Sequence, residues 1–121
     1  LMLTIYEYAK CSTCRSALKH LDAKKVKYTK IPIVDQPPTA AELKRMLGYL
    51  KAAGKTLRNL FNTSGEQYRA LRIGERLKAG MTEAEAIALL AKNGKLIKRP
   101  FILSARNGAI GFQPEVLDSL L

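Results

Sequence analysis

The chain is poor in the residues that form disulfide frameworks and metal centres. Its 121 residues include two cysteines, Cys11 and Cys14, and one histidine, His20. A closed zinc site needs four protein ligands, and these three residues of one chain cannot complete it. A structural disulfide between the two cysteines would close a very short loop and stabilise the fold little, because the entropic effect of a disulfide grows with loop length.

Long apolar runs are also missing. No apolar stretch approaches the roughly 20 residues of a membrane-spanning helix, and no secretory signal peptide precedes Thr4. We therefore expect a cytoplasmic protein with no membrane partner. In the reducing cytosol, two cysteines close in sequence favour redox chemistry over a structural bond.

Acidic residues are few, with 10 Asp and Glu against 21 Lys and Arg, which gives a formal net charge of +11. Such an excess can indicate an anionic partner. The cations are scattered along the chain, however, and we find no DNA-reading helix motif and no aromatic platform on which bases could stack. We therefore interpret the excess as a solvated basic surface and do not expect direct nucleic-acid binding.

The chain does contain enough apolar residues for one core. It is 47% hydrophobic and 26% charged, which is typical of a single globular domain over residues 1–121. Residues 3–8 and 26–33 alternate between apolar and polar side chains, which predicts two strands. Residues 15–24 carry apolar side chains at helical spacing. A strand–helix–strand unit has a right-handed crossover, so we expect the two strands to be parallel.

A helical region is predicted between the second strand and the last quarter of the chain, over about residues 39–93. Thr39 with Glu42 and Thr82 with Glu85 match the capping box that starts many helices. The expected helices cover about residues 39–54, 56–61, 66–71 and 82–92, and the last stops at Asn93-Gly94. No Ser/Gly-rich linker borders this region, so we expect an insertion packed on the same core and not a separate domain.

Two more strands and a helix complete the predicted order. Apolar runs at residues 101–104 and 109–112 flank Arg106-Asn107-Gly108, in which Asn-Gly is a pair typical of hairpin turns. Pro114 suits the first position of a helix that continues to Leu121. The complete order predicts an α/β thioredoxin-like fold, with a mixed four-stranded sheet and an inserted helical region.

The two cysteines form a Cys-x-x-Cys motif between the first expected strand and the first expected helix. Free backbone N–H groups and the helix dipole favour a thiolate on Cys11 there, and Lys10 and Arg15 add positive charge. We expect the pKa of Cys11 to fall from about 8.5 toward roughly 3.5–7.5. Cys14, one helical turn on, is placed to attack a mixed disulfide on Cys11. The alternative is a pair of inert buried thiols, since free cysteine packs as a small apolar residue.

Four segments spread over nearly the whole chain carry a resemblance to a known family. Residues 8–15, Tyr-Ala-Lys-Cys-Ser-Thr-Cys-Arg, match a Cys-containing loop between a strand and a helix, and residues 96–102 match a late Lys-Arg-Pro signature. Residues 35–39 and 60–65 look like segments of one branch of that family. On these motifs the chain resembles the arsenate reductase (ArsC)/Spx family, in its branch of uncharacterised Spx-like reductases.

The resemblance implies roles for three residues. Cys11 matches the family's nucleophilic cysteine, Arg99 the arginine beside it, and Pro100 the cis-proline of thioredoxin-like folds. A guanidinium group carries a permanent charge and a planar fork of donors, so Arg99 can stabilise a thiolate or hold an oxyanion. From composition alone, the alternative for Arg99 is one more surface cation.

Two positions depart from the arsenate reductases of the family. Those that use glutaredoxin surround their anion with three arginines, and here Asn62 and Gln113 occupy the first and the last of these positions. Neutral amides bind anions more weakly than guanidinium groups do, which argues against arsenate as the substrate. Arg58 and Arg106 lie near in sequence and are the candidates to replace the missing charges.

Our leading hypothesis is a cytosolic thiol–disulfide oxidoreductase in which Cys11 attacks, Cys14 resolves the mixed disulfide and Arg99 stabilises the thiolate or a small anionic substrate. The helix-start amides and hydroxyls would cradle the anion. The expected substrate-binding residues are Lys10, Ser12, Thr13, Asn62, Pro100 and Gln113. We expect no metal and no tightly bound cofactor, with reducing equivalents supplied by glutathione, glutaredoxin or thioredoxin.

Two alternatives belong to other functional classes. An Spx-like redox-responsive transcriptional regulator would bind RNA polymerase through the C-terminal domain of its α-subunit, and Gly54 lies near the position of an interaction glycine in such proteins. A helix-capping role is the favoured interpretation of Gly54. The second alternative is a glutathione- and glutaredoxin-dependent arsenate reductase.

Overall fold

The protein is built on a four-stranded mixed sheet. The computed structural model describes residues 2–121, and the strands lie in the order β2-β1-β3-β4. Their bounds are β1 Leu3–Glu7, β2 Tyr28–Pro32, β3 Phe101–Leu103 and β4 Gly108–Ile110. β1 pairs in parallel with β2 and antiparallel with β3, and β3 pairs antiparallel with β4. The predicted mixed sheet with parallel first strands is therefore confirmed.

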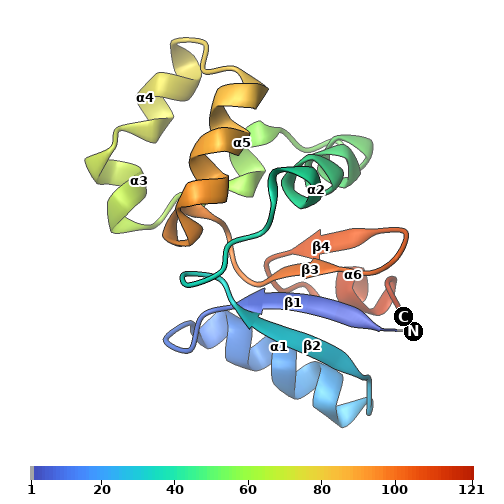
Figure 1. Ribbon diagram of the computed structural model, residues 1–121. Helices are drawn as coiled ribbons and strands as arrows, with labels where there is room; N and C mark the ends of the chain where they lie inside the picture. The colour runs from blue at the N-terminus through green and yellow to red at the C-terminus, as the bar shows by residue number, and fades with distance from the viewer. Residues whose placement is uncertain (1) are drawn as a thin grey trace.

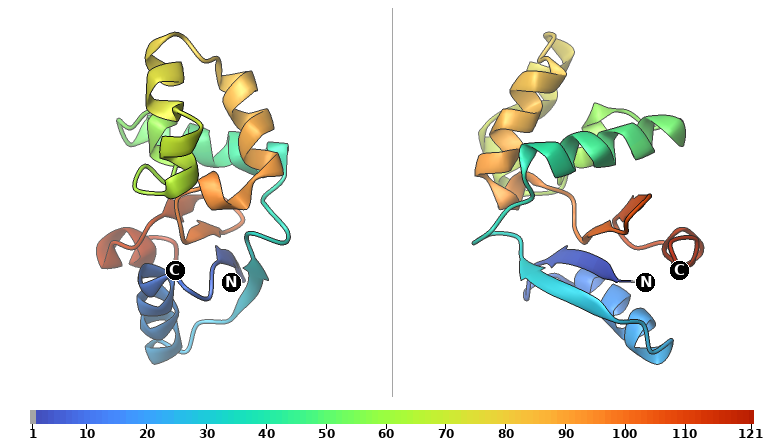
Figure 2. Two further views of the ribbon diagram at one scale, coloured as in Figure 1. Left: turned by 90° about the vertical axis from the view of Figure 1, so that its left-hand side faces the viewer. Right: turned by 45° about the vertical axis from the view of Figure 1, so that its right-hand side comes forward.

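Helices cover both faces of this sheet (Figure 1). Their bounds are α1 Ser12–Ala23, α2 Ala40–Ala52, α3 Glu66–Ala70, α4 Ile73–Lys78, α5 Glu83–Lys92 and α6 Pro114–Asp118, with single-turn 3₁₀ helices η1 Leu57–Leu60 and η2 Gly94–Leu96. Figure 2 shows the segment from α2 to α5 stacked over one face while α1 lies against the other. Within residues 2–121, every helix is too short or too polar to cross a bilayer.

Alternating side chains of the strands divide the core into two parts. Tyr6 and Phe101 pack with α2, α5 and the 3₁₀ helices on one face. Ile5 and Ile102 pack with α1 and α6 on the other. This is the two-residue period of extended strands, in which neighbouring side chains point to opposite faces. The sheet therefore shares apolar contacts with the helical segment above it and with α1 below it.

In the inserted helical region, the predicted capping boxes are formed, but not every helix has the predicted extent. α2 and α5 start after Thr39 and Thr82, and both capping boxes are formed. The expected helix over residues 56–61 is a single 3₁₀ turn. α4 was not predicted, because it starts after Arg72, which has a left-handed φ of 54° and gives no side-chain cap hydrogen bond. Sequence patterns that depend on Ser, Thr, Asp or Asn caps cannot indicate such a start.

The predicted stop of α5 at Asn93-Gly94 differs from the structure in detail. α5 ends at Lys92 as expected, but Gly94 does not adopt a left-handed φ and instead starts η2. A Cβ on Gly94 would overlap the backbone carbonyl of Ile33, so the glycine permits a close approach of two segments.

The hairpin between β3 and β4 is confirmed, and its turn is predicted in part, because Arg106 and Asn107 lie in the turn whereas Gly108 does not. Gly108 is the first residue of β4 and pairs with Leu103. The turn lies earlier, where the Ser104 amide donates to the Asn107 carbonyl at 2.9 Å. The Asn107 amide donates in return to the Ser104 hydroxyl at 3.2 Å. Backbone and side-chain hydrogen bonds between Ser104 and Asn107 therefore close this turn.

Candidate functional site

Cys11 occupies the N-cap position of α1, directly after the loop that leaves β1. Its backbone is extended, with φ of −101°, and its amide donates to the Tyr8 carbonyl at 3.0 Å. Its Sγ accepts a hydrogen bond from the Cys14 amide at 3.2 Å. The sulfur thus does what a serine or aspartate oxygen does at other N-caps. The helix starts at Ser12 and not at Arg15, so Cys11 caps the first turn and Cys14 belongs to it.

The two thiols have different surroundings. Both are free, with Cys11 half-buried and Cys14 buried. Burial, together with its hydrogen bond to Cys11, raises the pKa of Cys14 to about 12, although the nearby charge of Arg99 acts in the opposite direction. Cys14 is therefore a neutral thiol at neutral pH, and Cys11 is the thiol that solvent and ligands can reach.

A cavity of about 480 Å³ lies beside Cys11. It brings together five of the expected site residues from four separate parts of the chain, namely Cys11, Thr13, Asn62, Arg99 and Gln113. The other expected residues do not line it. Lys10 and Ser12 are exposed, while Cys14 and Pro100 are buried. The start of α1 and the segment after β4 lie far apart in the sequence. Both line the cavity that contains the Cys11 thiol.

Arg99 is held at the loop that leads into α1. Its guanidinium carbon lies 5.0 Å from the centre of the Tyr8 ring, within the range of a cation–π contact. Its Nη1 donates to the Lys95 carbonyl at 3.4 Å. No carboxylate forms an ion pair with Arg99 within residues 2–121. The Arg99–Pro100 peptide bond is cis, as the sequence resemblance implies.

Two lysines of the cavity were not expected from the sequence. Lys55 and Lys98 line it together with Arg99, and none of its lining residues is acidic. Lys98 immediately precedes Arg99 in the Lys-Arg-Pro signature, which is the one signal that could have indicated it. Charges of one sign around a hollow raise the local concentration of anions. The cavity therefore favours anionic ligands.

The backbone turn after α2 places Lys55 at the cavity. α2 ends in a Schellman motif, in which the Gly54 amide donates to the Lys51 carbonyl at 3.0 Å and the Lys55 amide to the Leu50 carbonyl at 2.9 Å. Gly54 has a φ of 78°, which favours glycine. The capping interpretation of Gly54 is confirmed, and the turn directs the chain from α2 to the cavity.

The amide of Lys98 and its side chain are both placed by neighbouring segments. The Lys98 amide donates to the Leu60 carbonyl at 2.9 Å. Its side chain lies over Gly111, where an added Cβ would come within 3.1 Å of Lys98 Cε. Gly111 also has a φ of 74°, a backbone conformation that favours glycine.

The two arginines that were candidates to replace the missing charges, Arg58 and Arg106, lie away from the cavity beside Cys11. Arg58 lines a different hollow, and its Nε lies 3.5 Å from the Tyr68 hydroxyl. Arg106 is exposed in the turn between β3 and β4 and does not line the cavity beside Cys11. Neither candidate lines the cavity, because nearness in sequence to Asn62 and Gln113 does not carry over to nearness in space.

A mixed four-stranded sheet, a Cys-x-x-Cys pair at the first helix and a cis-proline before the third strand define a thioredoxin-like protein with a dithiol site. The ArsC family model matches residues 6–120, and the chain belongs to the ArsC family.

Relatives of this chain cover it almost completely. The uncharacterised protein YusI of Bacillus subtilis is 41% identical over 93% of this chain and 92% of its own length. The crystal structure of an ArsC family related protein from Bacteroides fragilis superposes with a TM-score of 0.88, at 40% identity, over 100% of this chain and 98% of that one. The global transcriptional regulator Spx 2 of Bacillus anthracis is 29% identical over 99% of this chain and 87% of its own length.

Proposed function

We propose that the protein is a thiol–disulfide oxidoreductase that reduces small anionic disulfides. The observation that carries the proposal is a half-buried Cys11 at the start of α1, in a cavity with three cations and no lining carboxylate. Cys14 lies in the same helical turn. These are the parts that a dithiol reductase needs, namely an accessible sulfur, positive charge near it and a second thiol within reach.

The first step is attack by Cys11. Its Sγ, as the thiolate, attacks one sulfur of the substrate disulfide, a bond forms between the two sulfurs, and the other half of the substrate leaves as a thiolate that takes up a proton. The Cys14 amide already donates a hydrogen bond to Cys11 Sγ. That amide, the start of α1 and Arg99 stabilise negative charge on the sulfur.

The second step uses Cys14. Part of the reason that the pKa of Cys14 is raised is its hydrogen bond and charge interaction with Cys11. Once Cys11 is held in a mixed disulfide it carries no negative charge, so this part of the effect disappears and Cys14 loses its proton more readily. Cys14 then attacks Cys11 Sγ, the remaining half of the substrate leaves as a thiol, and a Cys11–Cys14 disulfide remains.

An external thiol completes the cycle. Two electrons and two protons from a reduced partner convert the Cys11–Cys14 disulfide back to two thiols, so each turnover reduces one substrate disulfide and oxidises one dithiol or two monothiols. Glutathione, glutaredoxin and thioredoxin are reductants of this kind in the cytosol, the compartment in which we propose that the protein works. No metal or tightly bound cofactor takes part in any step.

The cavity supports an anionic group on the substrate. Lys55, Lys98 and Arg99 supply charge, and Asn62 and Gln113 add neutral donors. A carboxylate or an oxyanion satisfies such donors, whereas an amine-bearing substrate is repelled.

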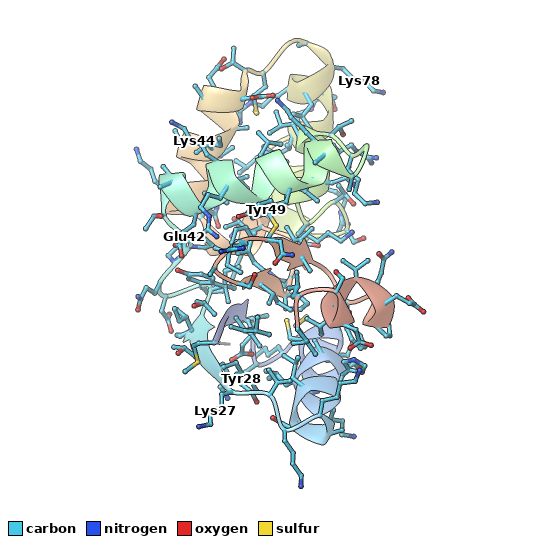
Figure 3. The ribbon with its side chains drawn as sticks, turned by 90° about the vertical axis from the view of Figure 1, so that its right-hand side faces the viewer. Lys27, Tyr28, Glu42, Lys44, Tyr49 and Lys78 are labelled. Atoms are coloured by element: carbon cyan, nitrogen blue, oxygen red, sulfur yellow. The ribbon has the colours of Figure 1, made fainter. Side chains whose placement is uncertain are left out.

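Rates of reduction of two small disulfides by the reduced protein test this proposal. Dithiodiglycolate carries two carboxylates and cystamine carries two amines, so we expect the first to react faster and the preference to shrink with rising salt. Lys98→Gln should lower the rate with dithiodiglycolate roughly three- to tenfold. Lys44→Gln, an exposed lysine on α2 (Figure 3), is the matched control and should leave that rate unchanged. Equal rates for both disulfides, or equal losses in both variants, would contradict the proposal.

Two other functions occur in relatives of this chain and make different predictions. A regulator like Spx would retain the C-terminal domain of the RNA polymerase α-subunit in a pull-down and show no turnover of disulfides. An arsenate reductase would release arsenite with glutathione and glutaredoxin, and would lose this activity in Cys11→Ser. We favour the oxidoreductase because Gly54 has a capping role that explains it, and because one arginine lines the cavity.

A further inference from the structure

A second and larger hollow lies within the inserted helical region. Its volume is about 970 Å³, against about 480 Å³ for the cavity beside Cys11. Residues of η1, α3, α4 and the turn before α5 line it, and we call it the insertion groove. Neither cysteine lines this groove, and nothing in the proposed reaction uses it.

Apolar side chains form one part of the insertion groove. Leu57, Leu77 and Met81 line it, and all three are half-buried. Each packs on its inner side against the core cluster above the sheet. Their remaining exposed surface is therefore fixed in place by the core, which makes it a preformed apolar contact for a ligand.

Positive charges form the other part. Arg58, Arg69, Arg72 and Lys78 line the groove and are all exposed. Glu75 is its one acidic residue, and it is paired with Arg72 at 3.0 Å. The other three cations form no ion pair within residues 2–121. The groove thus combines fixed apolar surface with unneutralised positive charge.

A hydrogen bond holds Arg69 in place, and the backbone turn at Arg72 brings two short helices to the same hollow. Arg69 Nη1 donates to the Ser64 carbonyl at 2.9 Å, which holds its guanidinium group on the loop before α3. Arg72 adopts a left-handed φ of 54° between α3 and α4. This backbone turn starts α4 immediately after α3, so side chains of both short helices line the same hollow.

We propose that the insertion groove binds an acidic peptide segment that also carries apolar side chains, from a partner protein. Carboxylates of such a segment would pair with Arg58, Arg69 and Lys78, and its leucine-like side chains would contact Leu77 and Met81. Nucleic acid fits less well, because Tyr68, the aromatic residue of the groove, is 8% exposed and offers no free ring face for stacking.

The insertion groove and the cavity beside Cys11 share η1 and the residues next to it. Lys55 and Asn59 line the cavity, while Leu57 and Arg58, which lie between them in sequence, line the groove. A partner docked in the groove is thus adjacent to the cavity. The proposal concerns binding alone, and it holds or fails independently of the proposed oxidoreductase reaction.

Fluorescence anisotropy tests the proposal with the full chain. The probe is a fluorescein-labelled peptide of alternating glutamate and leucine, titrated at physiological ionic strength. The double variant Arg69→Glu, Lys78→Glu should weaken binding about tenfold or more. The control Lys27→Glu, Arg106→Glu changes net charge equally, and both residues lie outside the groove. Figure 3 places Lys27 at the opposite end of the molecule from Lys78. The control should change affinity less than about twofold.

Peptide variants and a nucleic-acid probe complete the test. A glutamate–serine peptide should bind more weakly than the glutamate–leucine peptide, because it lacks the apolar contacts. No binding of the glutamate–leucine peptide, equal binding of the serine peptide, or equal losses in the two double variants would overturn the proposal. Stronger binding of a labelled single-stranded oligonucleotide, lost in the groove variant alone, would overturn it in favour of nucleic acid. Circular dichroism confirms that each variant is folded.

Discussion

The Arg99 guanidinium lies over the ring of Tyr8, with 5.0 Å between the guanidinium carbon and the ring centre. Tyr8 also accepts the amide hydrogen bond of Cys11 through its carbonyl. One residue of the loop thus contacts both the thiol-bearing residue and the cation proposed to stabilise its charge. This contact explains how Arg99, which lies 88 positions after Cys11 in the sequence, is held near the start of α1.

Removing the ring of Tyr8 should therefore slow the reaction of Cys11. A cation–π contact contributes about 0.5–2 kcal/mol, so we expect Tyr8→Leu to react with disulfides about two- to thirtyfold more slowly. Tyr8→Phe keeps the ring and the backbone carbonyl and should react like the natural protein. Stopped-flow measurement of dithiodiglycolate reduction gives both rates. Equal slowing in the two variants would show that the hydroxyl, and not the ring, matters.

The two thiols should differ sharply in alkylation. Because burial raises the pKa of Cys14 to about 12, this thiol stays protonated, and thus unreactive, at pH 7 to 9. We expect the folded protein at about pH 8 to take up one equivalent of iodoacetamide, at Cys11, and the unfolded protein to take up two. Peptide mapping by mass spectrometry identifies the labelled residue. Labelling of Cys14 at the rate of Cys11 in the folded protein would contradict this assignment.

Gly94 should be essential for packing. A Cβ at this position overlaps the Ile33 carbonyl, so Gly94→Ala should lower the free energy of unfolding by about 3 kcal/mol or more. Gly48 lies within α2 and has open space around it. Gly48→Ala is the matched control and should raise stability by about 0.5–1 kcal/mol. Urea denaturation measures both changes, and a tolerated Gly94→Ala would refute the close approach of the two segments.

Asp118 should contribute stability that depends on pH. Its carboxylate contacts Lys24 Nζ at 2.8 Å and His20 Nε2 at 2.7 Å. The hydrogen bond with Lys24 has the largest effect in lowering the pKa of Asp118, and the one with His20 adds to it. A carboxyl whose pKa is lowered by folding stabilises the protein above its unfolded pKa, and this contribution is lost as the pH falls through the folded pKa.

Asp118→Asn should therefore be less stable than the natural protein at pH 7, and the difference should vanish near pH 2, where the carboxyl is protonated in both states. Urea denaturation at the two pH values measures the difference. Asp35→Asn is the control, because Asp35 is exposed and forms no ion pair within the described residues. A loss of stability that persists at low pH would point to packing and not to charge.

Sequence patterns predicted the sheet and the long helices because these depend on local rules. Alternation in β1 and the capping boxes of Thr39 and Thr82 act within a few residues, and each is formed. The turn between β3 and β4 was predicted one residue too late, because hydrogen bonds between Ser104 and Asn107 close it and Gly108 belongs to β4. That residues 1–121 form a single domain stays a prediction.

The site was predicted in part for a similar reason. Cys11, Cys14 and Arg99 belong to motifs that can be recognised in a single sequence. Lys55 follows the Schellman turn at the end of α2. It lines the cavity because α2 packs beside the other segments that form the cavity. Arg58 was a candidate anion ligand because of its position in sequence, yet it lines the insertion groove. Long-range packing decided both cases, and no local pattern records it.

The mass of the Cys14→Ser variant after reaction with dithiodiglycolate shows which thiol attacks and which one resolves the mixed disulfide. If Cys11 attacks and Cys14 resolves, this variant accumulates one mixed disulfide, located on Cys11, while the natural protein ends as a Cys11–Cys14 disulfide without an adduct. Intact-protein mass spectrometry distinguishes the two products. An unmodified Cys14→Ser protein, or a lasting adduct on the natural protein, would contradict the account.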